Sequence, residues 1–196
     1  MANETAVFFG QFLRSPAVTG AVAPSSRRLS EAVCVPVPER GDPVVVELGP
    51  GTGPFTAEIQ RRIGGRGRHL AVEINPRLAG HLGARYPGVE LVVDSAARLP
   101  ELLAGRGVAA ADVIVSGLPW AAFPPAHQAD LLRAVVASLA PGGAFTTFSY
   151  VHARLLRAAL RFRRRLGEAF EEVVAGRTVW RNLPPAFVYH ARRPRR

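Results

Sequence analysis

A carboxylate followed by three alternating glycines is the first pattern in this chain that could hold a ligand. Glu47 ends an apolar run, and Gly49, Gly51 and Gly53 follow it at every second position. The spacing differs from the dinucleotide fingerprint G-x-G-x-x-G, whose third glycine would fall on Pro54 here. A carboxylate under the loop disfavours a pyrophosphate. It favours a ligand with a cationic end, which the glycines allow the backbone to approach closely.

Two further acids follow the next two predicted strands. Glu73 ends the second strand and Asp94 ends the third. Carboxyl ends of parallel strands form the binding edge of an open α/β sheet, where Glu73 can accept ribose hydroxyls and Asp94 an adenine amino group. S-adenosylmethionine combines an adenosine with an ammonium and a sulfonium and has no phosphate. We predict that this cofactor is bound by Glu47, Gly49, Gly51, Gly53, Glu73, Ile74, Asp94 and Ser95.

The elements needed to position these residues follow from the hydrophobic periodicity. Strands are predicted at residues 43–49, 68–74, 89–94, 111–119 and 143–150. Helices are predicted at 4–14, 54–63, 76–86, 97–105 and 125–140, and from a cap at Ser25 or Ser26 through Cys34. Five β–α alternations predict an α/β fold with a parallel sheet and helices on both faces.

The last part of the chain departs from this alternation. A helix is predicted at 153–166, and two strand-like runs at 170–180 and 186–193 are joined by only five residues. A link this short cannot make a parallel crossover, so we expect an antiparallel hairpin at the sheet edge. With no repeat and no sign of a second domain, residues 1–196 are predicted to form one domain.

Positive charge is concentrated in the same C-terminal region. The chain has a formal net charge of +10 and no lysine, and residues 154–196 hold 12 arginines and three acids. On the predicted helix at 153–166, an apolar face is interleaved with arginines, which is typical of a basic amphipathic helix that lies on anionic lipid. The apolar face is expected to comprise Leu155, Ala159, Phe162 and Leu166.

The N-terminal segment and the composition indicate where such a protein works. Residues 1–34, which include Phe8, Phe9 and Phe12, are expected to form a helical lid over the cofactor or a membrane contact. No run approaches the ~18 apolar residues that span a bilayer, and no signal peptide is evident. The single cysteine, Cys34, fits a reducing cytosol and a role as a small apolar filler. We expect a cytoplasmic protein, peripheral on the inner face of the membrane.

A Pro–aromatic turn follows the fourth predicted strand, in the stretch "SGLPW". Such a turn can hold a planar or cationic amine against an aromatic face. Tyr150 ends the fifth strand and is our first candidate for a proton acceptor or relay, ahead of His127 and His152. The predicted catalytic residues are therefore Tyr150, Trp120 and Ser116. The predicted substrate-binding residues are Gly117, Leu118, Pro119 and Trp120, and we assign no metal ligands.

Over nearly its whole length the chain resembles class I S-adenosylmethionine-dependent methyltransferases, which implies a Rossmann-like seven-stranded sheet with an antiparallel seventh strand. Within that class it is similar to bacterial phospholipid N-methyltransferases in four stretches. These are "FLRSPAVTGAVAPSSRRLSEAV", "ELGPGTG", "SGLPW" with Pro124–Pro125 after it, and "VWRNLPPAFVYHARR". The resemblance implies methyl transfer to the amine of phosphatidylethanolamine or a related lipid. The basic tail favours an anionic membrane surface as the partner over nucleic acid, because the sequence shows no basic groove studded with aromatic residues.

Three alternatives stay open at this point. A related enzyme could methylate the amine of a natural product or a peptide. The rRNA adenine dimethylases use a similar turn, but with asparagine and tyrosine where this chain has Gly117 and Trp120. They also carry a further C-terminal helical domain. The third alternative is a basic lipid- or RNA-binding module without catalysis.

Overall fold

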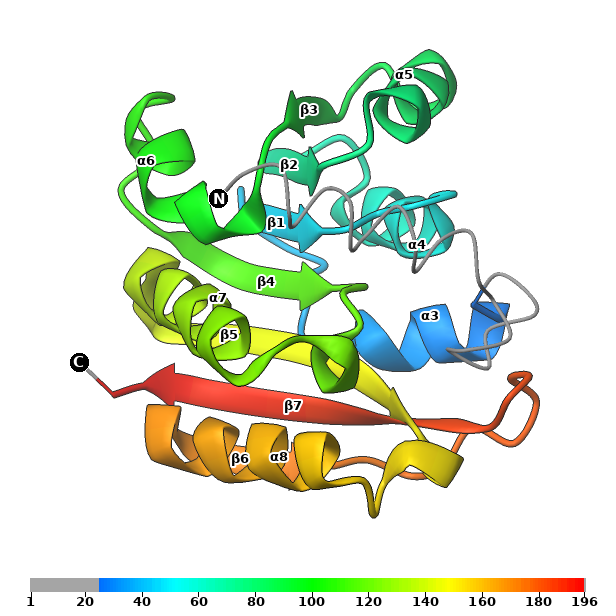
Figure 1. Cartoon of the computed structure of the whole chain (residues 1–196). Helices are drawn as coiled ribbons and strands as arrows, with labels where there is room; N and C mark the ends of the chain where they lie inside the picture. The colour runs from blue at the N-terminus through cyan, green and yellow to red at the C-terminus, as the bar shows by residue number, and fades with distance from the viewer. Residues whose placement is uncertain (1–24, 196) are drawn as a thin grey trace.

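The computed structural model describes residues 25–195, and these form a seven-stranded sheet between two layers of helices (Figure 1). The strands are β1 (Val44–Leu48), β2 (Arg68–Glu73), β3 (Glu90–Val93), β4 (Ala111–Ser116), β5 (Leu139–Tyr150), β6 (Phe170–Ala175) and β7 (Ala186–Pro194). Their order in the sheet is β3-β2-β1-β4-β5-β7-β6, and β7 runs antiparallel to both of its neighbours. The predicted fold class, including the C-terminal antiparallel hairpin, is confirmed.

Helices cover both faces of this sheet (Figure 1). One face carries α3 (Arg27–Val33), α4 (Pro54–Ile63) and α5 (Pro76–Arg85). The other carries α6 (Leu99–Ala104), α7 (Pro125–Ser138) and α8 (Arg157–Ala169). Three short 3-10 turns, η1 (Ala96–Arg98), η2 (Trp120–Ala122) and η3 (Val151–Ala153), follow the carboxyl ends of β3, β4 and β5. Most loops that could form a site therefore lie at one edge of the sheet.

Local sequence signals account for where the first helices begin. The Ser26 side chain caps α3 by accepting from the backbone N–H of Leu29 at 3.2 Å. Proline occupies the first turn of both α4 and α5, where a missing N–H costs nothing. Cys34 is fully buried under α4, and burial raises the pKa of its thiol, as suits an inert filler of the core.

Several boundaries differ from the predictions. The strands predicted at 111–119 and 170–180 end at Ser116 and Ala175. The helix predicted to extend to residue 140 ends at Ser138, and β5 already begins at Leu139. The "PGG" stretch is absorbed as an irregularity in β5, because the pairing with β4 shifts register between Ala111 and Val113.

The prediction of a basic helix at 153–166 was wrong in its start and in part of its apolar face. The chain first makes η3, which is held by a 3.0 Å hydrogen bond from the N–H of Val151 to the carbonyl of Pro185, so α8 begins only at Arg157. Leu155 precedes the helix and is 83% exposed. Ala159, Phe162 and Leu166 do form the apolar face, which is buried against the sheet.

The predicted helix at 4–14 lies outside the described residues, as does most of the segment 1–34 that was expected to form a lid or a membrane contact. Within residues 25–195, no helix is long and apolar enough to cross a bilayer.

The burial pattern of α8 predicts unequal costs for one substitution at two positions. Leu166 is fully buried and Leu160 is 48% exposed. Leu166→Ala should lower the free energy of unfolding by about 2–5 kcal/mol, because it leaves a cavity in the core. Leu160→Ala should change it by less than about 1 kcal/mol. Urea denaturation followed by circular dichroism measures both, and equal costs would contradict the placement of α8.

Candidate active site

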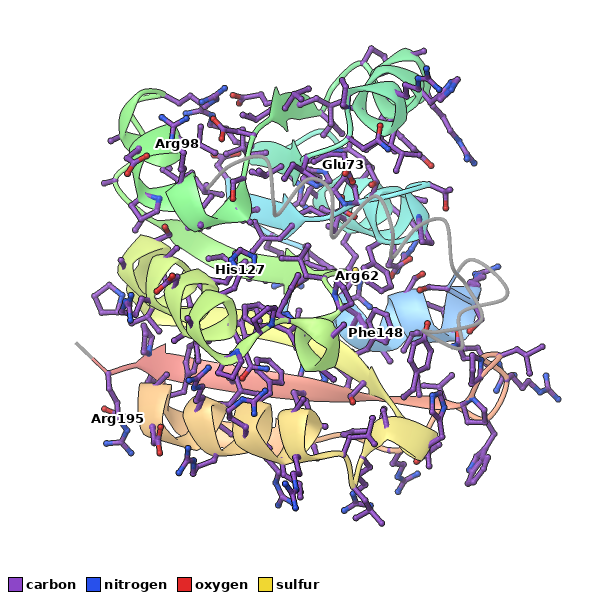
Figure 2. The ribbon with its side chains drawn as sticks, in the orientation of Figure 1. Arg62, Glu73, Arg98, His127, Phe148 and Arg195 are labelled. Carbon is purple, nitrogen blue, oxygen red and sulfur yellow. The ribbon has the colours of Figure 1, made fainter. Side chains whose placement is uncertain are left out.

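A pocket opens where the carboxyl ends of β1, β2, β3 and β4 meet. Six residues predicted from the sequence line it: Gly49, Glu73, Ile74, Asp94, Ser95 and Leu118. The structure thus brings together the glycine loop, two of the three predicted carboxylates and the turn after β4. Figure 2 shows Glu73 at the end of β2 and His127 on α7; with Asp94, these are the titratable side chains that line the pocket in the described part of the chain.

The glycine loop adopts a backbone conformation that side chains disfavour. Gly49, Gly51 and Gly53 have φ angles of 65°, 57° and 86°, all in the left-handed region. A Cβ at Gly49 would lie 2.7 Å from Leu118 Cδ2, and one at Gly53 would lie 2.5 Å from Leu82 Cδ1. A Cβ at Gly51 would meet nothing within 4 Å. Two of the glycines therefore permit close packing, whereas Gly51 leaves space beside the loop.

The Glu73 carboxylate is held by the loop that it supports. Its Oε2 accepts the N–H of Gly51 at 3.1 Å, and its Oε1 accepts the N–H of Asn75 at 2.9 Å. Only 1% of the residue is exposed, and this burial raises the pKa of the carboxyl despite the backbone N–H groups, which lower it. Glu73 therefore couples the end of β2 to the glycine loop and lines the pocket.

Asp94 lines the pocket in partnership with an arginine that sequence reasoning did not single out. Its Oδ2 accepts from Arg98 Nη1 at 2.8 Å, and its Oδ1 accepts the N–H of Ser95. The Ser95 hydroxyl accepts the N–H of Ala97 at 3.3 Å and so caps η1. Arg98 also binds Glu101, so the end of β3 is fixed by a surface ion-pair chain. Figure 2 labels Arg98 beside α6, at the start of which it lies.

Glu47 is the one predicted carboxylate that does not line the pocket. It is fully buried, its Oε2 accepts from Thr56 Oγ1 at 2.7 Å, and His69 Nε2 lies 3.2 Å from the same oxygen. Gln60 Nε2 lies 2.9 Å from His69 Nδ1, and donation to that atom leaves the imidazole proton on Nε2, facing Glu47. Among the described residues, Glu47 Oε1 has no hydrogen-bond partner. A carboxyl oxygen is therefore buried beneath the glycine loop with its acceptor capacity unused.

The turn after β4 is built around the Ser116 hydroxyl. Ser116 Oγ accepts from Trp120 Nε1 at 3.0 Å and from the N–H of Leu118 at 3.3 Å, and its carbonyl accepts from Thr147 Oγ1 at 3.0 Å. One face of the Trp120 indole stacks on Phe162 of α8, with the ring centres 4.7 Å apart. Ser116 and Trp120 are thus buried groups that fix the turn, and Pro119 between them is half-buried. Their predicted roles in the acceptor site stay predictions.

Gly117 lies directly against the glycine loop. Its N–H donates to the carbonyl of Leu48 at 2.8 Å, and a Cβ built on it would lie 2.6 Å from the carbonyl oxygen of Gly49. The side chain of an asparagine at this position would collide with the loop backbone. The glycine is therefore required by the packing of β4 on β1.

Tyr150 ends β5 at the same edge, but it does not belong to the lining of the pocket among the described residues. Its ring stacks on His152 at 5.6 Å and meets the edge of Phe148 at 5.4 Å. Burial raises the pKa of the phenol, so Tyr150 is protonated at neutral pH. It can relay a proton or accept a hydrogen bond, and its role stays a prediction.

The far wall of the pocket was missed as a binding surface. Phe123, His127 and Leu131 come from the end of η2 and from α7, and Val72 and Ala96 complete the lining. His127, considered from the sequence only as a proton acceptor, lies edge-on to Phe123 at 4.9 Å, and burial lowers the pKa of its imidazole. Their spacing matches no motif, and the only signal was that α7 must cover the sheet beside β4.

Comparisons with known proteins agree with this geometry. A family model described as a methyltransferase domain matches residues 45–143. The ornithine lipid N-methyltransferase of Singulisphaera acidiphila is 36% identical over 192 residues, which cover 95% of this chain and 94% of that protein. Aeropyrum pernix fibrillarin, solved with natively bound S-adenosyl-L-methionine, is similar with a TM-score of 0.62 and 19% identity, over 84% of this chain and 74% of its own. TrmN from Thermus thermophilus has a TM-score of 0.65 and 19% identity; the match covers 91% of this chain and 52%, about half, of TrmN.

The chain belongs to the class I S-adenosylmethionine-dependent methyltransferases. The predicted enzyme class and the predicted cofactor are confirmed. The residues of this methyltransferase fit that cofactor. The unused oxygen of Glu47 suits a cationic group, the space beside Gly51 admits a ligand, and the lining combines apolar side chains with Glu73 and Asp94.

The contact at Gly117 predicts a loss of cofactor binding from one added methyl group. Gly117→Ala forces the ends of β1 and β4 apart, which should lower the free energy of unfolding by about 1–3 kcal/mol. It should also weaken binding of S-adenosylhomocysteine, measured by titration calorimetry. Gly142→Ala is the matched control, because a Cβ there meets nothing within 4 Å. Wild-type affinity in Gly117→Ala would contradict the contact.

The environment of Glu73 predicts the pH dependence of cofactor binding. An ionised Glu73 is needed to accept hydroxyl hydrogen bonds, and its pKa is raised above the ordinary 4.5. Affinity for S-adenosylhomocysteine should therefore fall as the pH drops through this raised value, at a higher pH than an ordinary carboxylate would give.

Glu73→Gln should cost about 1–3 kcal/mol of binding at neutral pH and abolish this pH dependence. The exposed Glu168→Gln, on α8 outside the pocket lining, is the control variant and should keep both the affinity and the pH dependence. Titration calorimetry across the pH range measures both the affinity and its pH dependence, and circular dichroism confirms that each variant is folded. An unchanged pH profile in Glu73→Gln would assign the titration to another group.

Proposed function

We propose that the protein methylates the amine of a membrane lipid, with a phosphatidylethanolamine-type head group as the first candidate acceptor. One observation carries the proposal. The relative that matches this chain over 95% of its length is named an ornithine lipid N-methyltransferase. Ornithine lipid and phosphatidylethanolamine both present an amine at a membrane surface, so this likeness supports the acceptor class, and the single lipid is the finer part of the proposal.

S-adenosylmethionine supplies an electrophilic methyl group on its sulfonium when it is bound. In the proposed arrangement, Glu73 accepts the ribose hydroxyls, Asp94 and Ser95 lie beside the adenine, and Glu47 offsets the cationic amino-acid end from below the loop. The apolar wall from Phe123 to Leu131 excludes water from the nucleoside. These residues bind and orient the cofactor; transfer itself mostly requires alignment of nucleophile, methyl group and sulfur.

The acceptor amine must lose a proton before it attacks, because an aminoethyl group is an ammonium at neutral pH. Tyr150 is proposed to orient the amine through its phenol oxygen and to relay this proton. Its raised pKa makes it a relay rather than a resident base. His152, stacked on the same ring and exposed to solvent, is suited to pass the proton outward.

The rRNA adenine dimethylase alternative is less well supported. The asparagine of that turn is replaced by Gly117, where a Cβ would already lie 2.6 Å from the Gly49 carbonyl oxygen. An amide side chain that grips adenine has no room at this position without movement of the glycine loop.

Methyl transfer to defined vesicles tests the acceptor. Purified protein with labelled S-adenosylmethionine is offered vesicles of phosphatidylethanolamine, vesicles of ornithine lipid, soluble amines and ribosomal RNA. Mass spectrometry then counts mono-, di- and trimethyl products. We expect label in an amine-bearing lipid and none in RNA. Turnover of a soluble amine with no lipid product would refute the proposal, whereas label in ornithine lipid alone would correct only the head group.

A further inference from the structure

Exposed apolar side chains gather in two loops that follow β5 and β6. The first loop, residues 151–156, holds Leu155 and Leu156, both exposed. The second loop, residues 176–185, joins β6 to β7 and holds Trp180 and Leu183, which are 74% and 69% exposed. Large apolar side chains this exposed are uncommon away from interaction sites when they lie together. We call these two loops the two-loop surface.

The two loops lie against each other. The N–H of Val151 donates to the carbonyl of Pro185 at 3.0 Å, and Tyr150 pairs with Ala186 across β5 and β7. The Arg154 guanidinium lies 5.9 Å from the centre of the Phe187 ring. Figure 1 shows the yellow segment after β5 beside the orange loop before β7. The two loops are therefore neighbours at one end of the sheet.

A buried amide gives the second loop a fixed shape. Asn182 is 4% exposed, donates from Nδ2 to the carbonyl of Pro184 at 2.8 Å, and accepts the N–H of Ser26 on Oδ1 at 2.8 Å. Trp180 and Leu183 lie on either side of Asn182 in the chain and are exposed to solvent. Their exposure is thus a property of an ordered loop.

The charge of the two-loop surface has one sign. The two loops and the residues that flank the first one, 150–157 and 176–185, contain Arg154, Arg177 and Arg181, with Arg157 at the start of α8, and no acid. In the described part of the chain none of these four arginines is in an ion pair, whereas Arg164 and Arg193 further along are paired with glutamates. Exposed Trp and Leu in the same loops as unpaired arginines match the composition of a membrane interface, where the aromatic and apolar groups enter the head-group layer and the cations meet lipid phosphates.

The direction of the strands places the two-loop surface at the edge of the sheet where the pocket lies. β5 runs parallel to β4, and β6 has the same direction because both β5 and β6 are antiparallel to β7. The loops after β5 and β6 therefore leave the sheet at the edge where the cofactor pocket and the "SGLPW" turn lie. A bilayer on the two-loop surface would hold lipid head groups beside that edge.

We propose that the two-loop surface docks the enzyme on an anionic bilayer, with Leu155, Leu156, Trp180 and Leu183 entering the head-group layer. The inference deepens the proposed function, because it names the surface that would present a lipid acceptor to the site. It also relocates the membrane contact expected from the sequence. Only the first turn of α8 takes part, and the buried face of that helix stays in the core.

Intrinsic fluorescence reports docking directly, because the chain has only two tryptophans and Trp120 is buried. Vesicles containing phosphatidylglycerol should shift the Trp180 emission to shorter wavelength, and brominated lipid should quench it. Neutral phosphatidylcholine vesicles should produce much weaker changes. Trp180→Phe should still sediment with anionic vesicles but lose the shift. An unshifted spectrum at vesicle concentrations that bind the protein would overturn the proposal.

Paired variants separate the apolar and charged contributions. Leu155→Ser with Leu183→Ser should lower affinity for anionic vesicles, whereas the equally polar change Val35→Ser, at a 60% exposed position elsewhere, should not. Arg177→Glu with Arg181→Glu should weaken vesicle binding by more than about tenfold. Arg40→Glu with Arg77→Glu alters the net charge identically and should have a much smaller effect.

Two further measurements keep docking distinct from catalysis. Every variant should bind S-adenosylhomocysteine as the wild type does and should methylate a short-chain, micelle-free amine lipid at the wild-type rate. If the wild type binds anionic vesicles but does not methylate this amine lipid, the proposed function is refuted and the docking proposal stands. Vesicle binding unchanged in both two-loop variants would overturn the proposal, and so would variants that lose only RNA binding or only self-association in sedimentation experiments.

Discussion

The site depends on the close approach of two backbones at the ends of β1 and β4. The N–H of Gly117 binds the Leu48 carbonyl at 2.8 Å, and on the other side the N–H of Gly49 binds the Val72 carbonyl at 2.9 Å. The last residue of β1 is therefore fixed by both neighbouring strands before the chain turns into the glycine loop. Side chains are excluded from this contact, since a Cβ on Gly117 would reach the Gly49 carbonyl oxygen. The path of the loop, and with it the N–H group that Gly51 presents to Glu73, follows from this constraint.

The carboxyl side chain of Glu47 is buried beneath that loop, and its burial has an energetic cost. Burying a carboxylate is costly unless its oxygens are hydrogen-bonded. Thr56 donates to one oxygen of Glu47, His69 Nε2 lies 3.2 Å from the same oxygen, and the other oxygen has no hydrogen-bond partner among the described residues. A cationic cofactor offsets this cost in the proposed arrangement, so cofactor binding and the stability of the loop would be coupled. His69 is placed in one tautomer, because donation from Gln60 to Nδ1 leaves the imidazole proton on Nε2, the nitrogen that faces Glu47.

The parts of the fold and site that the sequence could predict are those determined by local sequence patterns. Strand ends, helix starts at Pro54 and Pro76, and the E-x-G-x-G-x-G loop each depend on residues close together in the chain. Phe123 and Leu131 escaped prediction because they reach the pocket only after η2 and α7 fold back over the sheet. The ion pair of Arg98 with Asp94 was missed for lack of any motif. The start of α8 was misplaced because a hydrogen bond to Pro185, 34 residues after Val151, decides where the preceding turn ends.

The arginine-rich C-terminal region shows how a composition signal can be assigned to a face that the core already uses. An amphipathic helix can enter a membrane only if its apolar side is free, and the apolar side of α8 is occupied. Phe162 stacks on Trp120, and Leu166 is fully buried in the same core as Phe145 and Phe170. Withdrawing these side chains into lipid would expose the turn that positions Ser116 and would cost the packing between α8 and the sheet. Apolar area available to a partner must therefore come from residues that the core does not use. In this region the three most exposed of them, Leu155, Trp180 and Leu183, lie in the loops before α8 and after β6, at the edge of the sheet where the pocket lies.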